Sequence, residues 1–201
     1  MPPFPKPGQM AFKFTRLEIP AVVAIQPSVA ADRRGYFLEC YKESEFVRGG
    51  VASRFVQENL SFSVKGVIRG MHYQLNPHAQ SKLVGVVSGE VFDVAVDMRT
   101  GSPTYGRWAS KRLSSENHTL LFVPAGFAHG FCVLSDSALV SYKVTSEYAP
   151  ASERGVKWDD SALAIEWPVR RSTVSDKDAS LPTLERAENN FRYGEDPRGS
   201  S

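Results

Sequence analysis

The alternation of apolar and polar residues with a period of two is the feature that most restricts the fold of this chain. Residues 82–99 read KLVGVVSGEVFDVAVDMR. In the second half of this run, Val94 and Val96 fall on one side of an extended chain, and Asp93 and Asp97 fall on the other. Successive side chains of a β-strand point to opposite faces, so this pattern predicts strands.

Short apolar runs recur along the chain, and turn residues separate them. Ser88-Gly89 divides residues 82–99 into two runs and predicts a hairpin turn. Further strands are expected in RFVQENLSFS (54–63), HTLLFVP (118–124), GFCVLS (130–135) and ALVSYKVT (138–145). One short helix is expected in KESEFVRGG (42–50), which ends in glycine. Many short strands at this spacing predict an all-β fold, an antiparallel barrel or jelly roll with a few short helices.

The length of 201 residues fits one domain with polar ends. Residues 1–10 are rich in proline, and the last residues lose the strand period and end in glycine, proline and serine. We therefore expect a folded domain over residues 11–183. An N-terminal extension should precede it over 1–10, and a mobile polar tail should follow it over 184–201.

Composition excludes several classes of partner. The sequence has 24 Lys and Arg against 22 Asp and Glu, a net charge of +2, which gives no single-sign field for nucleic acid. No stretch approaches the roughly 20 apolar residues that span a bilayer. Prolines stand where a signal peptide would carry an apolar run, and two cysteines are too few for a disulfide framework. We expect a cytoplasmic protein that binds neither nucleic acid nor a membrane.

The segment GVIRGMHYQ (66–74) places Arg69, His72, Tyr73 and Gln74 between two apolar runs. A buried polar side chain is costly unless it is hydrogen-bonded. A sheet interior therefore accommodates these four side chains only if that interior is a site, whereas a surface hairpin would hold them harmlessly.

The segment VPAGFAHGF (123–131) has Pro124, Gly126 and His129 at the spacing of a turn that feeds a strand. It resembles the second half of the cupin signature, whose histidine often binds a metal. The first half would require a histidine two residues after His72, where Gln74 stands. Metals in such barrels usually take three or four nitrogen or oxygen ligands, so the sequence predicts no metal site.

A metal-free barrel leaves two interpretations of His72. One is a hydrogen-bonded structural histidine. The other is a general base, because an imidazole has a reference pKa of about 6.5 and a carboxylate can orient it. Lys82 and Tyr142 are available on expected strands to offset charge on an oxygen and to return a proton. Spacing alone leaves open whether these side chains meet.

The order of the motifs carries a family resemblance. GVIRGMHYQ is followed by AQSKLVGVVSGEVFDVAVDMRTGSPTYGRW, FVPAGFAHGFCVLSD, YKVTSEYAP and VSDKDASLP. From about residue 12 to 183 the chain resembles the dTDP-4-dehydrorhamnose 3,5-epimerases. The resemblance implies a cupin-type jelly roll, acting as a homodimer and without any cofactor. The implied substrate is dTDP-4-dehydro-6-deoxy-D-glucose and the product dTDP-4-dehydro-L-rhamnose, in dTDP-rhamnose and polysaccharide biosynthesis.

The resemblance also implies roles for single residues. His72 would be the proton acceptor, with Asp178 as its carboxylate partner. Lys82 would stabilise the enolate oxygen, and Tyr142 would be the proton donor on the opposite face of the sugar ring. The residues expected to bind the substrate are Arg34, Glu39, Gln57, Asn59, Arg69, His129, Glu153 and Lys177.

Three alternatives stay open on the sequence. The first is an epimerase of a related nucleotide sugar that inverts only C3 or only C5. The second is a metal-dependent cupin enzyme built on His72 and His129, which would require stoichiometric metal for activity. The third is a non-catalytic module that binds nucleotide sugars without solvent exchange at any carbon. Glu147-Tyr148 stands where relatives often carry an aromatic pair, so the contacts to the base are also open.

Overall fold

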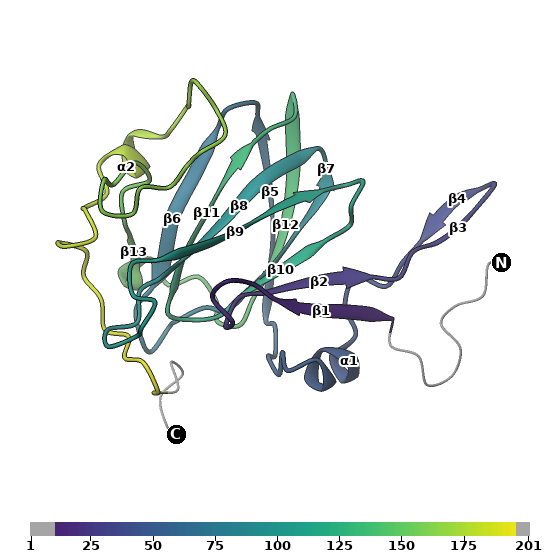
Figure 1. The fold of residues 1–201 in the computed structure, drawn as a ribbon, viewed down its shortest axis with the longest axis horizontal. Coiled ribbons are helices and arrows are strands. Elements are labelled where there is room, and N and C mark those ends of the chain that lie inside the picture. Colours follow the sequence, from purple (N-terminus) through teal and green to yellow (C-terminus); the bar gives the residue numbers. More distant parts are fainter. Residues whose placement is uncertain (1–10, 196–201) are drawn as a thin grey trace.

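Two antiparallel sheets form the body of the molecule in the computed structural model, which describes residues 11–195 (Figure 1). The first sheet contains, in spatial order, β1 (Phe12–Arg16), β2 (Val23–Pro27), β10 (Leu120–Val123), β7 (Lys82–Ser88), β12 (Ser137–Val144) and β5 (Gln57–Val64). The second contains β13 (Glu153–Gly155), β6 (Ile68–Gln74), β11 (Phe127–Val133), β8 (Glu90–Asp97) and β9 (Trp108–Ser114). This arrangement confirms the predicted all-β jelly roll. The expected extension over residues 1–10 lies outside the described residues.

Apolar side chains from both sheets meet in one core. Val84 and Leu121 of the first sheet pack in the same buried cluster as Val91 and Phe127 of the second. Each strand contributes alternate residues to this interior, since its side chains point to the two faces in turn. The apolar residues of the alternating pattern thus form the core between the two sheets.

The turn at Ser88-Gly89 is present, but the predicted hairpin is wrong. β7 pairs with β10 and β12 in the first sheet, whereas β8 pairs with β11 and β9 in the second. The chain therefore crosses between sheets at Gly89, which has a φ of +83° and leaves no room for a Cβ. The sequence pattern of two consecutive apolar strands does not show whether the strands pair in one sheet or belong to two sheets that pack across a core.

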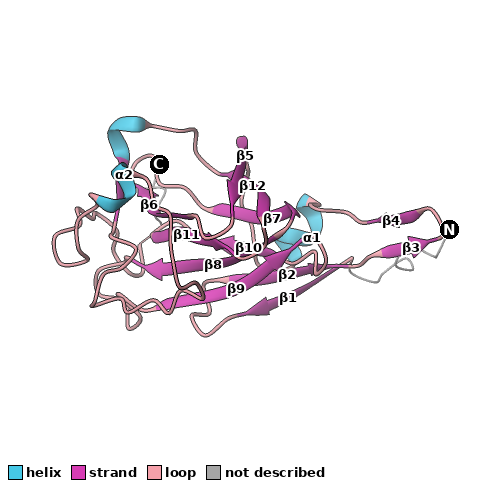
Figure 2. Ribbon diagram, turned by 90° about the horizontal axis from the view of Figure 1, so that it is seen from above, coloured by secondary structure: helices cyan, strands magenta, loops and turns pink. Residues whose placement is uncertain are grey.

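Helical structure is as scarce as the sequence predicts. α1 (Glu43–Arg48) confirms the expected helix, and the others are the short α2 (Asp176–Ala179) and the 3₁₀ turn η1 (Pro150–Ser152). A two-stranded ribbon, β3 (Ala30–Asp32) and β4 (Gly35–Phe37), extends away from the barrel (Figures 1 and 2). Across residues 11–195, no helix is long and apolar enough to cross a membrane.

Residues 184–195 differ from the expected polar tail because they pack on the outer face of the second sheet (Figure 1). Phe191 is only 2% exposed and its ring contacts the ring of Tyr73, with the centroids 5.8 Å apart. The Thr100 amide donates to the Phe191 carbonyl, and the Tyr193 amide donates to the Thr100 carbonyl. The sequence hides this packing because the apolar residues stand singly, without a strand or helix period.

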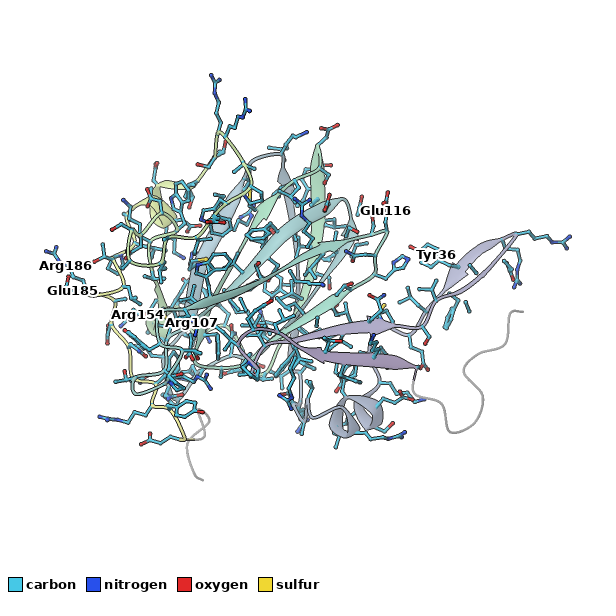
Figure 3. The ribbon with its side chains drawn as sticks, in the orientation of Figure 1. Tyr36, Arg107, Glu116, Arg154, Glu185 and Arg186 are labelled. Carbon is cyan, nitrogen blue, oxygen red and sulfur yellow. The ribbon has the colours of Figure 1, made fainter. Side chains whose placement is uncertain are left out.

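Replacement of Phe191 tests whether this C-terminal segment contributes to the fold. We expect Phe191→Ala to lower the free energy of unfolding by about 3–5 kcal/mol, as buried phenylalanines do. Denaturant unfolding measures this change. Glu185→Ala is the control, since Glu185 lies in the same segment and projects from the surface (Figure 3). Equal stability of the two variants would show that the segment is not part of the folded domain.

Candidate active site

The strands β6 and β11 approach closely at the centre of the second sheet, and glycines make this approach possible. A Cβ added to Gly70, which has a φ of +123°, would lie 2.5 Å from the Cα of Gly130. The pairing of the two strands is irregular between His129 and Phe131. Beyond this point His72 of β6 lies opposite His129 of β11, so both imidazoles lie on the same face of the sheet.

Asp178 holds His72 from the far end of the chain. Its Oδ1 lies 2.9 Å from His72 Nε2, and its Oδ2 accepts from the Gly70 amide at 3.1 Å. The carboxylate sits on α2, where the Ser175 hydroxyl accepts from the Asp178 amide at 3.1 Å and begins the helix. Burial alone raises the pKa of Asp178, but the hydrogen bonds from His72, Gly70 and Ser175 outweigh it and lower the pKa. The ionised carboxylate therefore fixes the orientation of the imidazole.

Lys82 is buried at the start of β7, and its ammonium group donates to the His72 carbonyl at 3.3 Å. Burial lowers the pKa of Lys82 to about 8, although the nearby carboxylates of Asp93 and Glu153 act in the opposite direction. The cation predominates below that pH, and it carries a charge that water does not screen.

Two cavities of about 320 and 310 Å³ share His72, Lys82 and Tyr142 in their walls. The predicted catalytic side chains therefore converge, with Asp178 in the wall of the second cavity. Tyr142 reaches them from β12 of the first sheet, opposite His72 of the second. Burial raises the pKa of the Tyr142 hydroxyl, so it stays protonated at neutral pH.

A second histidine–carboxylate pair lies beside the first. His129 Nε2 is 2.8 and 3.0 Å from the two carboxylate oxygens of Asp93, and both residues are buried. Asp93 lies on β8 and faces the interior. The alternation along this strand would equally allow its side chain to point to the opposite face of the sheet. His129 also lines the second cavity.

The remaining predicted substrate-binding residues divide between the two cavities. Gln57 and Asn59 of β5 line the first, and a hydrogen bond of 2.8 Å joins their side chains. Arg69 lines the second and donates to the Ser63 hydroxyl at 2.8 Å. Glu153 of the first cavity pairs with Lys177 of the second at 2.8 Å. This ion pair joins β13 to α2 across the boundary of the two cavities.

Arg34 and Glu39, which are predicted to bind the substrate, line neither cavity of this chain. Arg34 sits at the turn of the ribbon β3–β4, where its exposed guanidinium pairs with Asp32 at 2.5 Å. Glu39 follows the ribbon, 3.9 Å from the ammonium of Lys42. Because the ribbon extends away from the barrel, Arg34 and Glu39 do not reach His72 of the same chain.

No group of three or more His, Cys, Asp or Glu side chains is placed to hold a metal ion within residues 11–195. His72 and His129 each bind a carboxylate of this chain instead. Gln74, at the position of the missing ligand, bonds to backbone groups.

The geometry agrees with the family resemblance of the sequence, and a family model decides the matter. The model described as dTDP-4-dehydrorhamnose 3,5-epimerase matches residues 16–186. The chain belongs to this family. A dTDP-4-dehydrorhamnose 3,5-epimerase from Shigella flexneri is 52% identical over 164 residues, which make up 81% of this chain and 91% of that relative.

Solved epimerase structures share the whole fold. The crystal structure of dTDP-6-deoxy-D-glucose-3,5-epimerase from Legionella pneumophila in complex with dTDP-4-keto-L-rhamnose is 44% identical. It matches with a TM-score of 0.84 over 87% of this chain and 94% of that one. A relative from Streptomyces niveus, named dTDP-4-dehydrorhamnose 3-epimerase, is 42% identical over 172 residues, or 85% of this chain and 83% of the relative. The predicted cupin-type jelly roll is thus confirmed for this member of the epimerase family.

Sequence reasoning about this epimerase missed two supporting residues. Ser175 caps α2, and the spacing of Ser175 and Asp178 is that of a serine followed three residues later by an acid, a recognisable helix start. Gln74 belongs to the polar segment 66–74, but the sequence predicts no role for it. No local pattern connects it with the loop at residues 146–149 that it contacts.

Replacement of Asp178 tests the contact that holds His72. We expect Asp178→Ala to lower the free energy of unfolding at pH 7 by about 3 kcal/mol, because charge-assisted hydrogen bonds are lost and the Gly70 amide is left without an acceptor. The folded state lowers the pKa of Asp178. Its stabilising effect is therefore present above the ordinary value of 3.8 and is lost as the pH falls through the folded-state pKa.

Urea unfolding at several pH values measures this difference. Asp176→Ala removes an exposed carboxylate from the same helix and should change stability by no more than about 0.5 kcal/mol. The assignment fails if the two variants are equally stable at pH 7, or if the deficit of Asp178→Ala persists in acid.

Proposed function

We propose that this protein epimerises C3 and C5 of dTDP-4-dehydro-6-deoxy-D-glucose and yields dTDP-4-dehydro-L-rhamnose. The observation that carries the proposal is the meeting of the His72–Asp178 pair with Lys82 and Tyr142, because His72, Lys82 and Tyr142 line both cavities. The Shigella flexneri relative bears the name of this activity, and the Legionella pneumophila structure holds dTDP-4-keto-L-rhamnose. The reaction would serve dTDP-rhamnose and polysaccharide biosynthesis in the cytoplasm.

The chemistry follows from the C4 ketone of the substrate. C3 and C5 both flank that ketone, so removal of a proton from either carbon places negative charge on the same oxygen. His72 accepts the proton, and Asp178 stabilises the imidazolium that forms. Lys82 stabilises the enolate oxygen as a buried cation. One base and one cation thus serve both inversions, and no step in this scheme requires a cofactor.

Inversion requires reprotonation from the other face of the ring. His72 and Tyr142 come from opposite sheets, which supports a sugar held between them with the tyrosine as donor. Around the nucleotide part, Arg69 and Lys177 supply positive charge for the diphosphate, and arginine can bind phosphate oxygens in pairs. We assign the other contacts to Gln57, Asn59, His129 and Glu153.

We further propose a homodimer. Leu60, Phe62 and Val64 on the outer side of β5 are 66, 62 and 55% exposed, and β5 is the edge strand of its sheet. An apolar exposed strand of this kind marks a surface that pairs with another chain. The alternate residues Gln57 and Asn59 of the same strand line the first cavity, so a second copy on β5 would lie beside the substrate.

The proposed dimer also gives a role to Arg34 and Glu39, which lie outside the cavities of their own chain. The ribbon β3–β4 extends beyond its own barrel (Figure 1). Arg34 at its turn is 66% exposed. We propose that the ribbon of one protomer reaches the cavity of the other, where Arg34 and Glu39 bind the nucleotide sugar.

A second candidate function is supported by one comparison. The Streptomyces niveus relative, named a 3-epimerase, is 42% identical to this chain, close to the similarity of the 3,5-epimerases. Inversion of C3 alone would use the same base and the same cation. The two candidates differ in how many carbon positions exchange with solvent.

Proton NMR of the substrate in heavy water tests the reaction. We expect deuterium at both C3 and C5, because each proton passes through groups that exchange with solvent. His72→Asn should slow exchange at both carbons by about 10²–10⁴-fold, the usual contribution of a general base. Exchange at C3 alone would assign the protein to the monoepimerases.

The same measurement has two controls. His78→Asn changes an exposed histidine that lines neither cavity and should leave the exchange unchanged. Chelator treatment should also leave the rate unchanged, and activity restored only by added metal would support the metal-dependent alternative. Tight substrate binding with no exchange at any carbon would support a binding module.

The dimer has its own test. We expect Phe62→Asp to convert a dimer to a monomer in light scattering, because it places a charge in an apolar contact, and to raise KM by removing the partner's ribbon. Tyr105→Asp is the matched control, as Tyr105 is an exposed aromatic (40%) outside β5 and the ribbon. A monomeric wild-type protein, or a Phe62→Asp variant that stays dimeric, would refute this interface.

A further inference from the structure

The reaction proposed above leaves Gln74 without a role, although it belongs to the polar segment that contains His72. Its side chain is 3% exposed and is bonded at both ends of the amide. Nε2 donates to the carbonyl of His78 at 2.7 Å and to that of Glu147 at 3.2 Å, and Oε1 accepts from the Ala149 amide at 2.8 Å. A buried side chain with these bonds determines the position of the backbone that it holds.

Two more glutamines bind the same loop. Gln80 Nε2 donates to the Ser146 carbonyl at 2.7 Å, and Gln57 Oε1 accepts from the Tyr148 amide at 2.9 Å. Each of the four residues 146–149 therefore has one backbone group bonded by a glutamine side chain. We call Gln57, Gln74 and Gln80 the glutamine clamp. β12 ends at Val144, and beyond this residue the glutamine clamp, in place of a neighbouring strand, bonds the backbone.

The side chain that the clamp positions is Tyr148. It lines the first cavity and is 55% exposed, and its hydroxyl donates to Glu153 at 2.7 Å. Glu153 in turn pairs with Lys177, the neighbour of Asp178 on α2. The ring is thus fixed through both its backbone and its hydroxyl, and an aromatic face held in this way binds a planar ligand at a low cost in conformational entropy.

We propose that Gln74 is a positioning residue for the nucleotide, acting through the 146–149 loop and Tyr148. This inference rests on the proposed function, because the ligand is the nucleotide part of a dTDP-sugar. The amide of Gln74 contacts the loop and not the atoms of His72, Lys82 or Tyr142 that carry out proton transfer. Loss of the amide therefore weakens binding and spares the chemical step.

Calorimetric titration with dTDP, together with steady-state kinetics, tests this role. We expect Gln74→Leu to raise the Kd for dTDP and the KM roughly tenfold, equivalent to about 1.4 kcal/mol, with kcat changed by less than about twofold. Gln80→Leu, which removes a single bond to the loop, should act in the same direction and serves if Gln74→Leu does not fold. Gln26→Leu is the matched control, because Gln26 donates to the Asn117 carbonyl, in a turn outside both cavities.

A double-mutant cycle separates positioning from general destabilisation. In a Tyr148→Ala background, Gln74→Leu should raise the Kd no further, since the ring that it positions is gone. If the wild-type protein and Gln74→Leu bind dTDP equally well, this inference is wrong, but the proposed function is unaffected. Additive effects of the two substitutions, or an equal loss of affinity in Gln26→Leu, overturn it as well. A wild-type protein that binds no dTDP overturns the proposed function and, with it, this inference.

Discussion

The carboxylate of Asp178 is the contact on which the site depends. It joins the C-terminal part of the chain to the centre of a sheet, 106 residues away from His72 in sequence. One oxygen orients the imidazole and the other accepts from the Gly70 amide. At this residue β6 also approaches β11 so closely that a side chain does not fit, because a Cβ at Gly70 would lie 2.5 Å from the Cα of Gly130. One ionised group thereby holds the His72 imidazole, the strand β6 and the helix α2 together.

The same alternation that fills the core also builds the cavity. On β12, Val140 and Val144 are buried in the barrel, and Tyr142 lies between them on the same face. On β8, Asp93 faces inward and bonds His129. A site of this kind requires polar groups in an interior of low dielectric, where each group must be paired. The pairs His72–Asp178 and His129–Asp93 meet that requirement, and they leave Lys82 as a buried cation facing the cavity.

The edges of the cavity follow a different rule. Here regular pairing ends, and side chains take over the bonding of the backbone. The glutamine clamp holds residues 146–149, and the Glu153–Lys177 pair connects β13 to α2. The exposed apolar side of β5 adjoins the same edge. His72, Lys82 and Tyr142 therefore stand on paired strands, whereas hydrogen bonds between side chains and backbone hold the 146–149 loop that carries Tyr148.

The sequence by itself determined the all-β class, the helix at 43–48, the positions of β5, β7, β8, β10, β11 and β12, and the residue types of the site, because a period of two and turn residues are local properties. The resemblance to the family motifs also indicates His72, Lys82, Tyr142 and Asp178 as site residues, without the structure. Local pattern was insufficient wherever two distant segments meet. The strands on either side of Gly89 lie in different sheets, Phe191 is buried by a segment that reads as polar, and Arg34 lies on a ribbon that leaves its own barrel. Tertiary structure decided these points, since pairing and burial depend on which surfaces face each other in space, and alternation along a strand specifies only that two faces exist.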